Sequence, residues 1–203
     1  MPSGQPEQKG VRSVAIPTAV AIALVVALAA LVGAFWLTGA RDSSIHPLIG
    51  GPFALMDGAG RAVTDETLRG RPFLVYFGYT HCPDTCPTEL ARISDVLTAM
   101  GDKAIPALFV TVDPERDTPK AMRDYVSSFD PHIVGLSGSP QAIGAAEKAF
   151  RVYARKGAAG SDGAYSMDHS SIVYLMSKAG AFVEVLNMDR PPKDIAKDLE
   201  QYL

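Results

Sequence analysis

The sequence has few cysteines and no marked excess of either charge. Cys82 and Cys86 are its only cysteines in 203 residues. Small secreted scaffolds stapled by disulfides carry more cysteines at wider spacings, so that class is excluded. Two cysteines also cannot build a structural zinc site from four sulfurs, or from three sulfurs and one imidazole. The net charge is −3, and without a basic excess we expect no nucleic-acid partner.

The amino-terminal part of the chain has a different composition from the rest. Residues 13–40 contain no Asp, Glu, Lys or Arg. About 20 apolar residues are enough to cross a bilayer, whereas a cleaved signal peptide has an apolar stretch of about 7–15. We therefore expect a cytoplasmic tail at 1–12 and a transmembrane anchor at 13–40; cleavage after the small residues Thr38-Gly39-Ala40 is the alternative. Lys9 and Arg12 precede the span, which predicts a single-pass protein of the inner membrane whose domain faces the periplasm or an equivalent exterior compartment.

The remaining residues are expected to form a linker at 41–50 and one α/β domain at 51–203. Apolar runs and turn signals predict strands at 52–56, 61–64, 73–77, 105–112, 171–176 and 181–187, with a short strand near Ile133. Helical spacing and caps predict helices at 87–100, 118–129, 140–150 and 191–203. Alternation of strands and helices indicates a layered α/β sheet. A cysteine pair after the first central strand, followed by a βαβ unit and a final hairpin and helix, is the thioredoxin-like arrangement.

Cys82 and Cys86 lie where the strand at 73–77 turns into the helix at 87–100. Because they are four residues apart, a disulfide between them would close almost no loop and add little stability. The positive end of the helix dipole favours a thiolate, which predicts reactive sulfurs with a pKa below the usual value of about 8.5. Three intervening residues allow either a redox disulfide or two sulfurs around one metal ion. Soft thiolates favour copper(I) among the metals.

A copper site that serves both oxidation states also needs an imidazole. His46 and His132 lie in loops and are interpreted as surface groups. His81 adjoins Cys82, and His169 precedes a predicted strand, so both remain candidates from the residues alone. Met167 offers a thioether, although methionine is more often packing material.

Three sequence blocks together amount to a family resemblance. They are Phe77–Leu90 with its Cys-Pro-Asp-x-Cys-Pro core, Val110–Pro119, and Met167–Ser170 followed by Tyr174-Leu175. With these blocks the chain resembles the Sco/SenC family of membrane-anchored copper proteins, which assemble the dinuclear copper centre of cytochrome c oxidase. The resemblance implies a thioredoxin-like fold and copper(I) and copper(II) binding by Cys82, Cys86 and His169. It also implies three partners: the copper-bearing oxidase subunit, a periplasmic copper donor and a thioredoxin-like reductant.

The acidic residues of the second block have a structural interpretation as well. Asp113 precedes a proline, which favours extended backbone and ends the strand. We interpret Glu115, Arg116 and Asp117 as turn and capping residues. Asp113 lies near the carboxyl end of a strand, where α/β sheets place their sites. It is a candidate for a residue that influences the site without binding the metal itself.

Other functions compete with a copper chaperone. The strongest is a membrane-tethered thiol-disulfide oxidoreductase, in which Cys82 and Cys86 cycle as a redox pair without a histidine. The two activities are compatible, since only the reduced pair binds copper. A peroxidase is rejected because Pro83 occupies the position where the similar peroxiredoxin segment has a hydroxyl. A purely structural domain would not need two thiols at a helix amino terminus.

Overall fold

The computed structural model describes residues 20, 27–29, 49–160 and 163–203. The chain divides into two compact units, Met1–Ile45 and His46–Leu203. In the first unit, residues 20 and 27–29 are helical. The expected tail at 1–12, most of the expected membrane span at 13–40 and most of the linker lie outside the described residues. Within the described ranges, no helix has the length and apolar character that crossing a bilayer requires.

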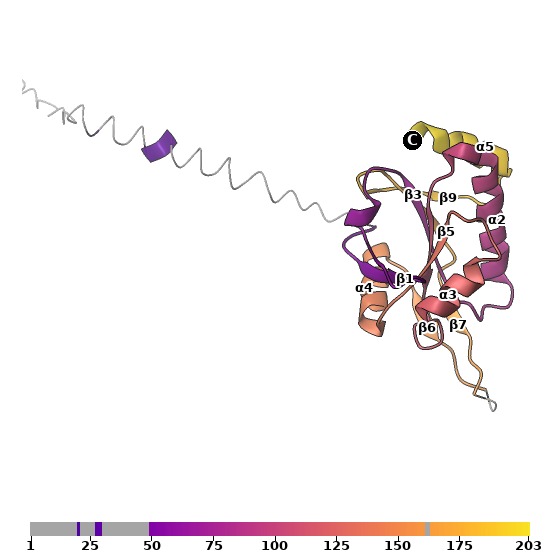
Figure 1. Ribbon diagram of the computed structural model, residues 1–203. Helices are drawn as coiled ribbons and strands as arrows, with labels where there is room; N and C mark the ends of the chain where they lie inside the picture. Colours follow the sequence, from indigo (N-terminus) through magenta and orange to yellow (C-terminus); the bar gives the residue numbers. More distant parts are fainter. Residues whose placement is uncertain (1–19, 21–26, 30–48, 161–162) are drawn as a thin grey trace, which may run out of the picture. The chain divides into compact units, whose positions relative to one another are not determined.

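The second unit alternates strands and helices (Figure 1). Its elements in chain order are β1 (Ala54–Asp57), β2 (Ala62–Thr64), a 3-10 turn (Glu66–Leu68), β3 (Phe73–Gly78), α2 (Thr85–Met100), a 3-10 turn (Gly101–Lys103), β4 (Ala107–Thr111), α3 (Pro119–Val126), β5 (Ile133–Ser137), α4 (Pro140–Phe150), β6 (Ala154–Lys156), β7 (Met167–His169), β8 (Val173–Met176), β9 (Phe182–Leu186), α5 (Pro192–Leu199) and a final 3-10 turn (Glu200–Tyr202). The predicted α/β class is confirmed.

Seven strands form one sheet in the order β2-β1-β5-β4-β3-β8-β9. β3, β4 and β5 are parallel, while β1, β8 and β9 pair in the antiparallel sense. The connection from β3 to β4 runs through α2, and the connection from β4 to β5 runs through α3. Both move across the sheet in the same direction, so right-handed crossovers place both helices on one face. The chain then returns through α4 on the other face (Figure 1). Every residue of β3 and β4 is buried, as the continuous apolar runs predict.

Aromatic side chains fill the core on both faces of the sheet. On the α4 side, the Phe150 ring packs against the Phe77 ring with centroids 5.5 Å apart. On the opposite side, Phe109 stacks between Tyr76 and Tyr125 at centroid distances of 5.8 and 5.7 Å. These contacts support the carboxyl end of β3 from both faces, which is where the cysteine loop begins.

Helix ends agree with the sequence where capping signals are present. Thr118 caps α3 by accepting a hydrogen bond from the Ala121 amide at 3.2 Å, as predicted. The predicted helix at 140–150 has those bounds in the structure. α3, however, ends at Val126 rather than near Phe129, and α2 begins at Thr85 rather than Pro87, so Cys86 lies inside the first helical turn.

A small second sheet was not predicted. β6 and β7 pair in the antiparallel sense, with Ala154 opposite His169 and Lys156 opposite Met167. The sequence predicts a loop through this region, because three-residue strands are too short to show alternation. Their pairing places His169 at the end of a strand rather than in a free loop.

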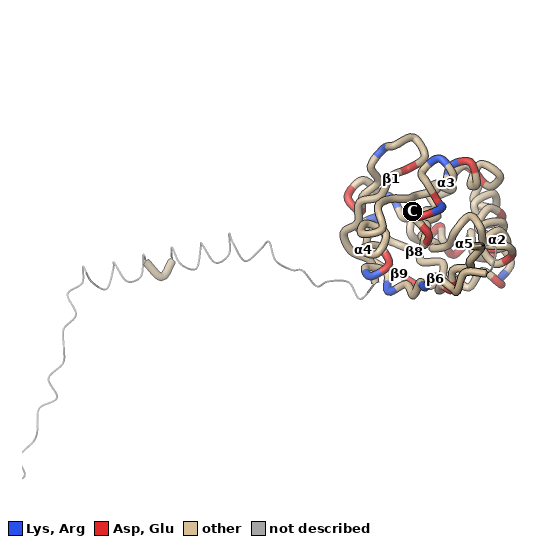
Figure 2. The backbone as a smooth tube through the Cα atoms, turned by 90° about the horizontal axis from the view of Figure 1, so that it is seen from below, with Lys and Arg blue, Asp and Glu red and all other residues tan. Residues whose placement is uncertain are grey.

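Charged residues of both signs are interspersed over the second unit. Figure 2 shows the Lys and Arg positions alternating with Asp and Glu positions around the backbone. Many of them form exposed ion pairs, such as Lys103 with Glu200 and Arg190 with Asp198. Exposed pairs of this kind add little stability, so the charge pattern does not determine the fold.

Candidate metal centre

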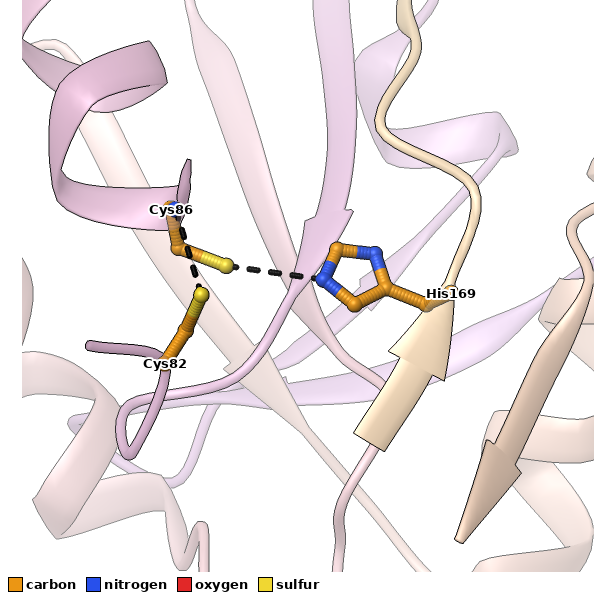
Figure 3. A group of neighbouring side chains, drawn as sticks. All are labelled: Cys82, Cys86 and His169. Carbon is orange, nitrogen blue, oxygen red and sulfur yellow. Dashed lines mark hydrogen bonds between the residues drawn. The ribbon is translucent and has the colours of Figure 1, made fainter. Parts of the chain in front are cut away.

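Two sulfurs and an imidazole nitrogen converge at the end of the central strand β3. The ligand atoms of Cys82, Cys86 and His169 all lie within 4.8 Å of one another. Cys82 comes from the loop after β3, Cys86 from the first turn of α2 and His169 from the end of β7 (Figure 3). The Cys86 amide donates a hydrogen bond to Cys82 Sγ at 3.3 Å, and Cys86 Sγ lies 3.6 Å from His169 Nε2. Both cysteines are free thiols.

A hydrogen bond on the far side of the imidazole orients His169. Its Nδ1 lies 3.0 Å from the Ser170 carbonyl oxygen, which only accepts hydrogen bonds, so Nδ1 carries the proton. In a neutral imidazole Nε2 then has a free lone pair, and this atom faces the sulfurs. The Tyr79 ring packs edge-on against the imidazole with centroids 5.7 Å apart. The ring is therefore held in the tautomer and orientation that a metal ligand needs.

The two sulfurs differ in burial, and this overturns one expectation. Cys86 is fully buried, whereas Cys82 is partly exposed. Burial raises the pKa of the Cys86 thiol to about 12, although hydrogen bonds from the Tyr79 backbone and the Tyr76 side chain act in the opposite direction. The helix dipole had suggested a pKa below the usual value. Cys86 is thus a protonated thiol in the metal-free protein at neutral pH, and a metal ion must displace its proton.

The last residue of β3 is a glycine for a steric reason. A Cβ atom at Gly78 would lie 2.8 Å from Cys86 Sγ and 2.7 Å from the ring of Phe109. Real Cβ atoms do not approach other atoms so closely, so a larger residue would displace the sulfur. Gly78 therefore makes room for the Cys86 side chain beneath the loop.

A pocket of about 330 Å³ opens onto the site. Its lining includes Cys82, Met167, Asp168, His169 and Tyr79. Cys86 lies buried behind this surface. Solvent and small ions therefore reach the site from the side of Cys82 and β7.

A buried carboxylate holds the cysteine loop in place. Asp117 has no exposed surface, and it accepts hydrogen bonds from the Thr80 amide at 3.0 Å and the Thr80 hydroxyl at 2.6 Å. It also accepts one from the Thr111 hydroxyl at 2.7 Å. Thr80 precedes Cys82 by two residues. The sequence alone indicates a turn or capping residue at Asp117, whereas in the structure its carboxylate connects the end of β4 to the cysteine loop.

A second cluster links the same sequence block to the histidine strand. Arg116 donates to the buried carboxylate of Asp113 at 2.5 Å and lies 3.7 Å from the centre of the Tyr165 ring. The Tyr165 hydroxyl donates to Asp113 at 2.9 Å. Tyr165 is two residues before β7, and Arg116 also lies over the Tyr79 ring at 5.8 Å. Asp113 is thus linked to His169 through the side chains of Arg116 and Tyr79.

The other histidines have different surroundings. His81 Nδ1 lies 3.0 Å from the Thr80 hydroxyl and 3.7 Å from an Asp117 carboxylate oxygen. His132 Nδ1 lies 2.7 Å from Asp130 at the surface. His46 is outside the described residues. Of the two histidines left open by residue reasoning, it is His169 that the fold brings to the sulfurs.

Sequence reasoning missed Thr80, Thr111 and Tyr165 as supporting residues. One signal was available for Thr111, because a hydroxyl in an otherwise apolar buried strand needs a hydrogen-bond partner. Thr111 is fully buried and donates to Asp117. Nothing in the sequence pattern pairs Tyr165 with Asp113, since 52 residues separate them.

The fold and the ligand group define a class of protein: a thioredoxin-like domain with a two-cysteine, one-histidine site after a central strand. The chain belongs to the SCO1/SenC family, whose family model matches residues 41–203. The mitochondrial SCO2 homolog of Danio rerio is 40% identical over 157 residues, which are 75% of this chain and 56% of that protein. The chain thus spans little more than half the length of this relative. The family resemblance of the three blocks is confirmed.

Two solved structures of the family bear on the site. Bradyrhizobium japonicum ScoI with copper bound is 54% identical, has a TM-score of 0.73 and covers 76% of this chain and 99% of its own. BsSco, whose structure identified a disulfide switch in a member of the Sco family of cytochrome c oxidase assembly proteins, is 25% identical with a TM-score of 0.61. That match covers 77% of this chain and 95% of BsSco.

Proposed function

We propose that this chain is a membrane-anchored copper metallochaperone. It delivers copper to, or prepares the thiols of, the dinuclear copper centre of cytochrome c oxidase. The observation that carries the proposal is the convergence of the Cys82 and Cys86 sulfurs and the His169 nitrogen within 4.8 Å. Soft sulfurs suit copper(I), and an added imidazole suits copper(II), so this donor set fits both oxidation states. The copper-bound relative at 54% identity supports the choice of metal.

Each ligand has a distinct part in holding the copper cargo. Cys82 meets the ion at the pocket, and Cys86 binds it after losing its proton, because the thiolate is the metal ligand. His169 presents Nε2 because Nδ1 donates to Ser170. Two thiolates are sufficient for copper(I), whereas copper(II) depends more strongly on the imidazole.

The same two sulfurs support a second, compatible activity. Cys82 and Cys86 are neighbours in space, with the Cys86 amide 3.3 Å from Cys82 Sγ, and BsSco has a disulfide switch. A reversible Cys82–Cys86 disulfide would empty the copper site, since a disulfide offers no thiolate. A thiol-disulfide oxidoreductase without metal delivery is the alternative function.

Anchoring and partners complete the proposal. The uncharged residues 13–40 support a single-pass anchor in the inner membrane, with residues 1–12 in the cytoplasm and the domain in the periplasm. The proposed partners are the copper-bearing oxidase subunit, a periplasmic copper donor and a thioredoxin-like reductant. A reporter fused after Leu203 should be active only outside the cytoplasm. Cytoplasmic activity, or a mature amino terminus at Arg41, would contradict the anchor.

Metal analysis distinguishes the chaperone from the pure oxidoreductase. The reduced full chain is offered copper, zinc and peroxide separately. Equimolar copper in the parent, and a clear loss of that stoichiometry in the Cys82→Ser, Cys86→Ser double variant, is the expected result. An oxidoreductase without metal delivery would instead form the disulfide and retain no copper.

The role of His169 is tested with His169→Ala and the matched surface variant His132→Ala. We expect His169→Ala to lose or greatly alter the copper(II)-thiolate absorption and electron-spin signal while still binding copper(I), because two soft sulfurs remain. Disulfide formation between Cys82 and Cys86 should be unchanged. His132→Ala should behave as the parent. A copper(II) spectrum that survives His169→Ala but is lost in His81→Ala would move the nitrogen ligand to the cysteine loop.

A further inference from the structure

We propose that Met167 is an additional copper(I) ligand at the mouth of the pocket, used while the ion enters or leaves the Cys82–Cys86 pair. The inference rests on the proposed copper function and adds a residue and a step to it. In that step the bond between copper and the Met167 thioether breaks as a bond between copper and a cysteine thiolate forms, and the proton displaced from the thiol passes to water. Copper remains in the +1 state, and no electron is transferred.

Met167 lies on the same face of β7 as His169. Successive side chains of a strand point to opposite faces, so positions 167 and 169 share one side and Asp168 takes the other. The burial pattern follows this alternation, because Met167 and His169 are partly buried and Asp168 is exposed. Both residues line the same pocket as Cys82. A thioether, a thiol and an imidazole thus border one opening.

The position of Met167 relative to Cys86 suggests when it acts. Cys86 is fully buried, whereas Cys82, Met167 and His169 border the pocket that leads to it. An incoming ion therefore meets the Met167 side of the pocket before it reaches Cys86. The backbone of Met167 pairs with Lys156 in the short β6–β7 sheet, while its unbranched side chain has three rotatable bonds and can follow the ion.

The chemistry of a thioether suits a transient ligand. It is soft, which favours copper(I) over copper(II) and over oxygen-seeking ions. It is also uncharged and has no proton to lose, so it holds the ion more weakly than a thiolate does. An ion bound by Met167 and His169 can therefore pass to the cysteine pair, and a departing ion has a ligand at the exit.

Methyl NMR on a chain without thiols tests the contact directly. In the Cys82→Ser, Cys86→Ser double variant with ¹³C-methyl methionine, silver(I) serves as a soft ion that does not change oxidation state. We expect the methyl signal of Met167, assigned by its loss in Met167→Leu, to shift on addition of silver(I). The exposed Met56 on β1 provides the internal control and should shift less. A Met167 signal that moves no more than that of Met56 overturns the proposal.

Transfer kinetics test the proposed step in the intact site. Met167→Leu keeps the volume of the side chain. It should bind equimolar copper with an unchanged copper(II) spectrum, yet take copper(I) from a chelator about tenfold more slowly, a change in barrier of about 1.4 kcal/mol. Met56→Leu should match the parent. Equal rates for parent and Met167→Leu overturn this inference and leave the copper site intact, whereas a parent that binds no copper overturns the proposed function itself.

Discussion

Replacement of Asp117 by alanine should destabilise the whole domain through the cysteine loop. The Asp117 carboxylate is fully buried and accepts three hydrogen bonds, two from Thr80 and one from Thr111. Removing the acceptor leaves the buried Thr111 hydroxyl without its acceptor and also breaks the bonds from the partly buried Thr80 amide and hydroxyl, at up to about 1–3 kcal/mol for each donor. Relaxation and water entry reduce the sum, so we expect Asp117→Ala to lower the free energy of unfolding by about 3–5 kcal/mol.

An asparagine at the same position should be much better tolerated. Its amide oxygen can accept from the Thr80 amide and the Thr111 hydroxyl, while its NH₂ group donates to the Thr80 hydroxyl oxygen. The remaining loss is that of the charge-assisted bonds, about 1–2 kcal/mol. Asp117→Asn therefore separates the geometry of the network from its charge.

Urea unfolding of the reduced, metal-free full chain provides the assay. The midpoint should fall in the order parent, Asp117→Asn, Asp117→Ala without a change in the dependence on urea. Asp124→Ala is the matched control, because Asp124 is exposed and paired only at the surface, and it should change stability by less than about 1 kcal/mol. An Asp117→Ala variant within about 1 kcal/mol of the parent would refute the assigned role of the network.

Three further predictions follow from the burial of single groups. Gly78→Ala should lower the free energy of unfolding by about 1–3 kcal/mol, because the added methyl group would clash with Phe109 and Cys86. Gly144→Ala is the control: Gly144 lies on α4 with open space around it, so this change should be neutral or stabilising. Equal unfolding midpoints for the two variants would contradict the prediction. In the reduced protein at neutral pH, iodoacetamide should modify Cys82 well before Cys86, because Cys86 is buried with its pKa raised to about 12, and peptide mass spectrometry detects the order. Burial raises the pKa of Glu147 from its ordinary value of 4.5 to about 7, so the protein loses stability as the pH rises through this range and the carboxyl group ionises. Glu147→Gln should therefore stabilise the chain by about 1 kcal/mol above that range and not below it. A stabilisation that does not depend on pH would argue against this reasoning.

The central strands and capped helices could be predicted because their determinants are local. The apolar run from Phe73 to Phe77 is long enough to identify a buried strand, and Thr118-Pro119 carries its own capping signal. The ends of α2 and α3 were predicted less well. Helix ends depend on tertiary contacts, and the amino end of α2 is packed around Cys86 in the core.

The candidate site was predicted only in part, for a physical reason. Cys82 and Cys86 are close in sequence, so their proximity follows from the chain itself. His169 was reached through the family resemblance, because 83 residues separate it from Cys86 and a strand pair that sequence patterns do not reveal positions it. The predicted direction of the shift in the Cys86 pKa was wrong. The position at a helix amino terminus can be predicted from the sequence, whereas the depth of burial cannot.

The proposed nitrogen ligand and the proposed sulfur ligands belong to parts of the domain with different resistance to local opening. The sulfurs are attached to β3 and α2, which lie in the buried main sheet and core, whereas His169 ends a strand held by only three residue pairs. Regions with few buried contacts open at lower free energy than the whole fold. The lifetime of a bond between His169 and a metal ion should therefore depend on how often the short β6–β7 sheet opens. A partner that binds the opened strands would remove the metal ion while the rest of the domain stays folded.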